Sequence, residues 1–134
     1  MNNFVNQITA DKWVGAVTDD AVIEFPTLQD LHRVIEALDA NVKTSVFLAG
    51  GNGAYMAIGG GFGRYVVYIS LRDKEFWNLY SGGTGANNVV SIVIGGQDGY
   101  YADRQVVDKN TAIKAAEYFF LNGEPDPAFH WERQ

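Results

Sequence analysis

The sequence is poor in residues that bind metals or act as nucleophiles, since it contains no cysteine and only two histidines. The absence of cysteine excludes disulfide frameworks, zinc fingers, iron–sulfur sites and cysteine nucleophiles. A metal site needs three or four convergent ligands, and neither His32 nor His130 belongs to such a pattern. Glu36 follows His32 by four residues and is expected to form an ordinary surface pair with it. We therefore predict neither a metal site nor another cofactor.

Positive charge is also scarce, since 10 Lys and Arg stand against 16 Asp and Glu, a net charge of −6. Binding of nucleic acid requires a positive surface that displaces counterions from phosphates, and no cluster of more than two neighbouring basic residues occurs. The composition therefore argues against a direct nucleic-acid partner. A basic protein is a suitable partner, because an acidic surface speeds and orients such encounters. Acidity that serves only solubility is the alternative.

Long hydrophobic runs are missing as well. The longest apolar stretches span a handful of residues, far fewer than the roughly 20 that a membrane-spanning helix requires. Residues 1–10 contain several amide side chains and no basic one, unlike a secretory signal. The expectation is a soluble, cytoplasmic protein with no membrane partner.

What the chain does contain is a large apolar fraction, 47% of its residues, including 8 Phe, 7 Tyr and 3 Trp. This content excludes intrinsic disorder. A length of 134 residues supports one domain, residues 1–134, built around one core.

Two helices are indicated by their boundaries and apolar spacing. The first is expected over residues 27–39, where Thr27 can cap the helix and Asp30 favours its first turn. The second begins after the candidate cap Asp108 and ends at Gly123.

The remaining apolar segments predict strands. Residues 13–17 and 21–25 flank a polar turn and indicate a hairpin. Further strands are expected at 43–49, 54–59, 64–72, 75–80, 89–95, 100–106 and 128–132. Glycine clusters at 50–53, 59–63 and 82–85 separate several of them, and such short connections join antiparallel neighbours.

We therefore predict an α+β fold: a single antiparallel, largely meander sheet of about six to nine strands, with two α-helices packed on one face. Alternation along the strands places Tyr68 on the other face from Tyr65, and Phe76 and Tyr80 on the other face from Trp77, so both faces of the sheet are partly apolar. An open face with such aromatics is a candidate binding surface. The N-terminal hairpin or a second copy of the chain could cover it instead.

Catalytic patterns are weak. None of the glycine clusters precedes Lys-Ser or Lys-Thr or opens a βαβ helix, so they are not nucleotide-binding loops. The carboxylate pairs Asp19-Asp20 and Asp73 with Glu75 give no evidence of the opposed geometry that glycoside hydrolysis needs. We therefore predict that the protein is not an enzyme. A small-molecule-binding or hydrolytic α+β domain, with a pocket between helix and sheet, is kept as the alternative.

The order of elements in the second half is more specific. A Gly95-Gly96 turn and a strand lead into an alanine-rich helix that contains Ala112 and Phe119, and Gly123, a proline and Trp131-Glu132 follow it. Over residues 26–134 this layout resembles a small immunity protein family of bacterial polymorphic toxin systems. Residues 1–25 form the expected N-terminal hairpin outside the resemblance. Members of the family are often paired with nucleic-acid deaminase toxins.

The resemblance implies that the chain binds a cognate toxin domain, a nucleic-acid deaminase or nuclease, and blocks its active site. Such a groove must be basic to hold a phosphate chain, and an acidic protein with aromatic anchors complements it. The predicted partner-binding residues combine aromatics and acids near strand ends: Trp77, Tyr80, Asp98, Tyr100, Tyr101 and Asp103. A homodimer that uses the open sheet face for self-association is a further possibility.

Overall fold

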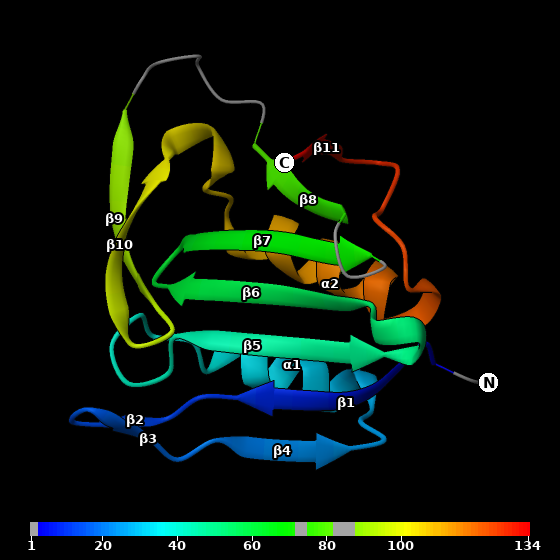
Figure 1. The fold of residues 1–134 in the computed structure, drawn as a ribbon, viewed down its shortest axis with the longest axis horizontal. Helices are drawn as coiled ribbons and strands as arrows, with labels where there is room; N and C mark the ends of the chain where they lie inside the picture. The colour runs from blue at the N-terminus through cyan, green and yellow to red at the C-terminus, as the bar shows by residue number, and fades with distance from the viewer. Residues whose placement is uncertain (1–2, 72–74, 82–87) are drawn as a thin grey trace.

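The computed structural model describes residues 3–71, 75–81 and 88–134. These residues form two α-helices and a seven-stranded antiparallel sheet, with two smaller two-stranded ladders. Both helices lie on the same face of the large sheet (Figure 1). The predicted α+β class is thus confirmed.

The large sheet has the strand order β11-β8-β7-β6-β5-β1-β4, and every neighbouring pair is antiparallel. The strands β5 to β8 follow one another along the chain, as predicted for a meander. Their short connections leave no room for parallel crossovers. The bounds are β1 (Val5–Ala10), β4 (Ala21–Glu24), β5 (Ser45–Gly50), β6 (Tyr55–Gly61), β7 (Arg64–Leu71), β8 (Glu75–Tyr80) and β11 (His130–Arg133).

The N-terminal segment differs from its prediction. It contains an additional strand, β1, which pairs with β4 on one side and β5 on the other. The short strands β2 (Trp13–Val14) and β3 (Val17–Thr18) continue the β1–β4 ribbon to a turn at Gly15, whose φ is 62°. The predicted turn at 18–20 is therefore wrong, because these residues lie on the returning arm. The ribbon extends the sheet edge and does not cover the open face (Figure 1).

The strands β9 (Val89–Ile94) and β10 (Gln97–Ala102) pair only with each other among the described residues. The second strand begins three residues earlier than the expected start at 100, and the 3₁₀ turn η2 (Asp103–Gln105) follows it. The β9–β10 hairpin stands at one end of the sheet (Figure 1). The predicted glycine turn at 82–85 and Asp73 lie outside the described residues.

The helices α1 (Leu28–Glu36) and α2 (Lys109–Asn122) close the core; a 3₁₀ turn, η1 (Gly51–Gly53), links β5 to β6. The Asp108 carboxylate accepts a hydrogen bond from the Thr111 backbone N–H at 2.8 Å, which satisfies a free donor of the first turn of α2. Gly123 ends the helix with a φ of 71°, a conformation that glycine adopts without steric cost. Three fully buried alanines let α2 pack closely on the sheet: Ala112, Ala115 and Ala116.

Candidate functional site

The sheet face away from the helices carries a row of aromatic side chains. Its four members, the aromatic row, come from four successive strands: Phe47, Tyr55, Tyr68 and Phe76. The ring centroids are separated by 6.1, 6.2 and 6.3 Å in that order, within the range of favourable aromatic pairs. Phe47 is 40% exposed and the other three are half-buried. The row therefore presents a continuous apolar surface across the middle of the sheet.

The β9–β10 hairpin forms a wall beside this face. Ile94 approaches the sheet at Gly59, where an added Cβ would lie 2.4 Å from the Ile94 side chain. A hollow of about 280 Å³ separates the hairpin from the sheet. Its floor includes Phe47 and Tyr68, and its wall includes Ile94 and Tyr101. We call this the sheet hollow.

Two tyrosine hydroxyls beside the sheet hollow, those of Tyr68 and Tyr101, have raised pKa values. Burial, together with the neighbouring Tyr55 and Tyr101, raises the pKa of Tyr68 to about 12. Burial also raises the pKa of Tyr101. Both hydroxyls stay protonated at neutral pH and can donate hydrogen bonds. The sheet hollow thus combines apolar contact with neutral donors, which suits docking of a protein surface.

The predicted contact residues of β8 lie on opposite faces of the sheet. Tyr80 lies on the open face, where its ring stacks on His130 at 5.9 Å and the Arg104 guanidinium lies 5.2 Å from its centroid. Trp77 pairs with the core residue Ile69 and points to the helix side. Its buried indole N–H has no hydrogen-bond partner within the described part of the chain. The structure therefore separates Trp77 from Tyr80.

The other four predicted contact residues lie on the β9–β10 hairpin or directly after it. Tyr101 points into the sheet hollow, whereas Asp98 and Tyr100 alternate with it and lie on the outer side. Tyr100 is 78% exposed, and Asp98 accepts a hydrogen bond from the Ser91 hydroxyl at 3.3 Å. Asp103 begins the turn η2 that follows. The assignment of these residues as toxin contacts stays a prediction.

Asp11, which no local sequence pattern marks, holds this region together. Asp11 is 8% exposed, and its carboxylate accepts hydrogen bonds from the backbone N–H and hydroxyl groups of Thr44 and Ser45 and from the Trp13 indole. Burial opposes ionisation, but these donors outweigh it and lower the pKa of Asp11. Thr44 in turn accepts from the Gly96 N–H at 3.1 Å. Asp11 thus connects β1, β5 and the β9–β10 hairpin.

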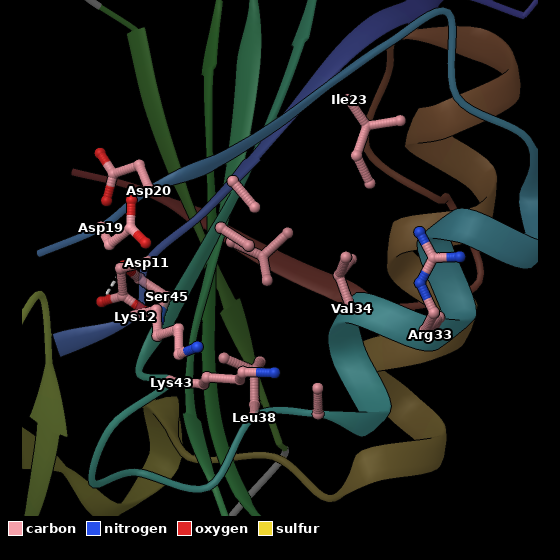
Figure 2. A pocket seen from close by; sticks show the side chains of 14 residues that line it. Asp11, Lys12, Asp19, Asp20, Ile23, Arg33, Val34, Leu38, Lys43 and Ser45 are labelled. Atoms are coloured by element: carbon pink, nitrogen blue, oxygen red, sulfur yellow. Dashed lines mark hydrogen bonds between the residues drawn. The ribbon is translucent and has the colours of Figure 1, made fainter.

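A second hollow, of about 450 Å³, lies between α1 and the β1–β4 ribbon (Figure 2). Figure 2 shows its acids along the ribbon and Arg33 on the helix opposite. Its volume is in the range of small-molecule sites. The charges balance, and Arg33 already pairs with Asp30 at 3.0 Å. The charged lining residues are Asp11, Lys12, Asp19, Asp20, Arg33 and Lys43.

The histidines have structural contacts. The Nε2 atom of His32 lies 2.8 Å from the Glu117 carboxylate on α2, and Glu36 pairs with Lys109 at 3.1 Å. The expected surface pair of His32 with Glu36 is therefore wrong, since both side chains reach across to α2. Within residues 3–71, 75–81 and 88–134, no group of three or more acidic or histidine side chains could hold a metal ion. In the same ranges, the helices are too short or too polar to cross a membrane.

Comparison with known proteins agrees with this architecture. The family model described as "Immunity protein Imm1" matches residues 19–133, which include the strands β4 to β11 and both helices. A search of curated proteins found no match. The family match confirms the resemblance to an immunity protein family. The chain belongs to the Imm1 immunity protein family.

Proposed function

We propose that the protein binds a cognate toxin domain that acts on nucleic acid, a deaminase or a nuclease, and blocks its active site without catalysis. Membership of an immunity protein family supports the inhibitory role. The net charge of −6 supports the class of partner, because a groove that holds a phosphate chain must be basic.

The single observation that carries the site is the aromatic row beside the wall of the β9–β10 hairpin. Aromatic side chains dominate binding energy at interfaces. Tyr80 and Tyr101 flank the same open face, and Asp98 and Asp103 supply negative charge at its border. Apolar anchors would therefore meet the toxin surface while the acids face basic side chains around its groove.

Calorimetric titration with the toxin domain encoded beside the gene tests the proposal. We expect a one-to-one complex with nanomolar affinity or tighter, about −12 kcal/mol, and complete loss of toxin activity at one equivalent. Absence of heat together with undiminished toxin activity would contradict it.

A charge reversal tests the acidic border. The double variant Asp98→Lys and Asp103→Lys should weaken toxin binding about tenfold or more, because like charges then face each other, with the melting temperature unchanged. The matched control is Asp19→Lys with Glu124→Lys, which makes the same change in net charge at two exposed positions outside the hairpin. Equal affinity of both double variants would refute the site.

The hollow between α1 and the β1–β4 ribbon favours the second candidate, a small-molecule-binding domain. A thermal-shift screen of charged metabolites tests it. A stabilising ligand whose effect disappears in Lys43→Ala would support this function, and a screen without any shift would count against it.

A further inference from the structure

Phe62 occupies an unusual backbone conformation. It is the first of the two residues that connect β6 to β7, with a φ of 53°, and Gly63 follows with a φ of 83°. Hairpin turns with positive φ at both central positions favour Asn, Asp or Gly. A bulky aromatic residue is an outlier in this region of backbone space. The local conformation therefore disfavours phenylalanine.

Packing does not compensate for this cost. The Phe62 side chain is 81% exposed, so it gains little from burial in the folded chain. Strained residues that persist without a structural benefit concentrate at functional sites. The ring is therefore free for contacts outside the chain. Phe25 shares both features, with a φ of 51° and an exposed fraction of 82%, so the assignment of Phe62 depends on its support and its surroundings.

The turn is held firmly by its neighbours. The Ala40 N–H donates to the Gly60 carbonyl at 3.1 Å, and a Cβ at Gly61 would lie 2.6 Å from the Ala40 nitrogen. Ala40 belongs to the loop of residues 39–43. The Asp39 carboxylate holds this loop by accepting hydrogen bonds, each 2.9 Å long, from the backbone N–H groups of Asn41, Val42 and Lys43. The Phe62 ring is therefore presented on a rigid support, which lowers the entropy cost of binding.

The surroundings of Phe62 resemble the border of an interface. A surface hollow of about 350 Å³ next to it is lined by Asp98 and Val93 of the hairpin and by Arg64. Tyr100 lies on the same outer side of the hairpin as Asp98. Two exposed aromatics, Phe62 and Tyr100, and the nearby acid Asp98 suit an apolar pocket bordered by basic side chains.

We propose that Phe62 is an anchor of the toxin interface and inserts its ring into an apolar pocket of the toxin domain, beside a basic side chain that faces Asp98. The inference rests on the proposed function. It adds the outer side of the β9–β10 hairpin and the neighbouring β6–β7 turn to the toxin-binding surface, which so far consisted of the sheet hollow and its border. Charge favours a toxin over a second copy of the chain, because each copy carries −6 and a basic groove is complementary to it.

The variant Phe62→Asn should raise the stability of the fold but weaken toxin binding. Asparagine is favoured at this turn position, so the melting temperature should rise by about 3 °C. Loss of the ring should weaken binding of the adjacent-gene toxin domain at least about 30-fold, the threshold of a hot spot. Calorimetry and thermal denaturation measure the two effects, and Phe62→Gly repeats the test with the other residue that the turn accepts.

Phe25 provides the matched control, because it is 82% exposed and has a φ of 51°, and it follows β4 at the opposite end of the sheet (Figure 1). Phe25→Asn should leave toxin affinity within about twofold of the wild type. The anchor role is overturned if Phe62→Asn retains wild-type affinity, if its affinity and stability fall together, or if it dissociates a wild-type dimer seen in sedimentation. A wild-type chain that neither binds nor neutralises the toxin overturns the proposed function and this inference together.

Discussion

At the scale of single residues, the carboxylate of Asp11 shows how one charged group joins segments that are distant in sequence. Its hydrogen-bond partners Thr44 and Ser45 lie 33 and 34 positions away. A buried carboxylate is stable only when donors replace its lost water, and here the two backbone N–H groups, the hydroxyls and the Trp13 indole do so. The start of β5 and the turn of the β9–β10 hairpin are positioned by this arrangement.

Replacement of Asp11 by asparagine should lower the free energy of unfolding by about 3 kcal/mol at pH 7, because an amide leaves some of these buried donors unsatisfied. The pKa of Asp11 is lowered in the folded chain, so its stabilising contribution is complete above its ordinary value of 3.8 and is lost as the pH falls through the folded pKa. Urea denaturation from pH 7 to pH 2.5 measures both effects.

The difference in stability between the wild type and Asp11→Asn should therefore shrink below about pH 4. Asp19→Asn is the control, since Asp19 is exposed and its replacement should change stability by less than about 0.5 kcal/mol. A difference that stays constant down to pH 2.5 would contradict the role of the ionised Asp11.

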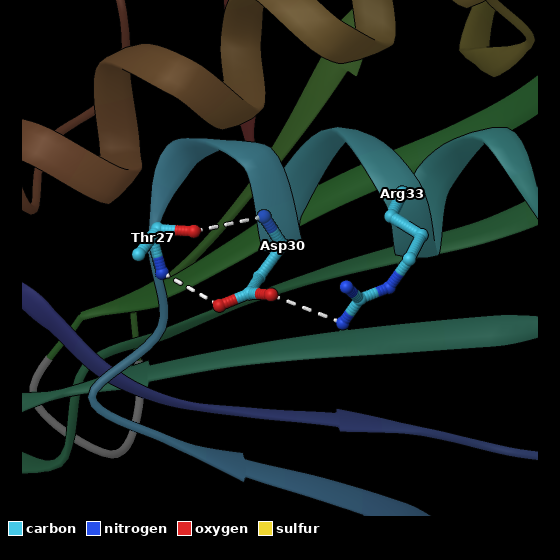
Figure 3. Close-up of polar contacts among 3 residues, drawn as sticks. All are labelled: Thr27, Asp30 and Arg33. Atoms are coloured by element: carbon cyan, nitrogen blue, oxygen red, sulfur yellow. Dashed lines mark hydrogen bonds and ion pairs between the residues drawn. The ribbon is translucent and has the colours of Figure 1, made fainter.

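At the scale of elements, α1 shows which boundaries local chemistry determines. The Thr27 hydroxyl accepts the Asp30 N–H at 3.1 Å, and the Asp30 carboxylate accepts the Thr27 N–H at 2.9 Å, while Arg33 pairs with that carboxylate (Figure 3). This reciprocal capping starts the helix at the predicted position. The end differs, since the helix stops at Glu36 and not at 39. Leu38 continues the apolar pattern but reaches the core from beyond the helix.

The β9–β10 turn allows a test of how the hairpin is held. Gly95 and Gly96 have φ values of 65° and 77°, but a Cβ at Gly96 would lie 2.4 Å from the Trp13 ring, whereas at Gly95 it would meet nothing within 4 Å. Gly95→Ala should cost only backbone strain, about 1 kcal/mol. Gly96→Ala adds the steric conflict and should cost about 2 kcal/mol or more.

Hydrogen exchange of the β9 and β10 amides, together with urea denaturation, measures this difference. We expect faster exchange in Gly96→Ala than in Gly95→Ala, because the added methyl group prevents Trp13 from packing against the turn. Equal exchange in the two variants would show that Trp13 does not restrain the hairpin.

At the scale of the whole molecule, charge and shape together support the inhibitory function. Both helices lie on one face of the sheet (Figure 1). The aromatic row lies on the other face, beside the hairpin wall. The net charge of −6 would attract the basic partner proposed above over its whole approach, whereas apolar contacts act only after docking. The charge should therefore control the rate of association more than the lifetime of the complex.

Association of the protein with its toxin domain should slow about tenfold or more when NaCl is raised from roughly 0.05 to 0.5 M, because salt screens long-range attraction. The dissociation rate should change much less. Stopped-flow fluorescence measures both rates. An association rate independent of salt would contradict the electrostatic part of the proposal.

The sequence by itself determined the features that depend on neighbouring residues. Helix caps at Thr27 and Asp108, the glycine stop at Gly123 and the alternation of strands β5 to β8 are local signals. The same alternation separates Tyr80 from Trp77, whereas only the packing of the helices shows that Tyr80 lies on the open face. Short connections between successive strands made their antiparallel pairing predictable.

Tertiary structure alone decided the features that depend on distant contacts. The place of β1 between β4 and β5 follows from pairing across the chain, and the hairpin rises over the open face because Trp13 and Thr44 hold its turn. The exposure and strain of Phe62 likewise arise from the loop that supports its turn. Local sequence patterns do not predict these long-range contacts, because burial and long-range hydrogen bonds arise only when the segments pack together.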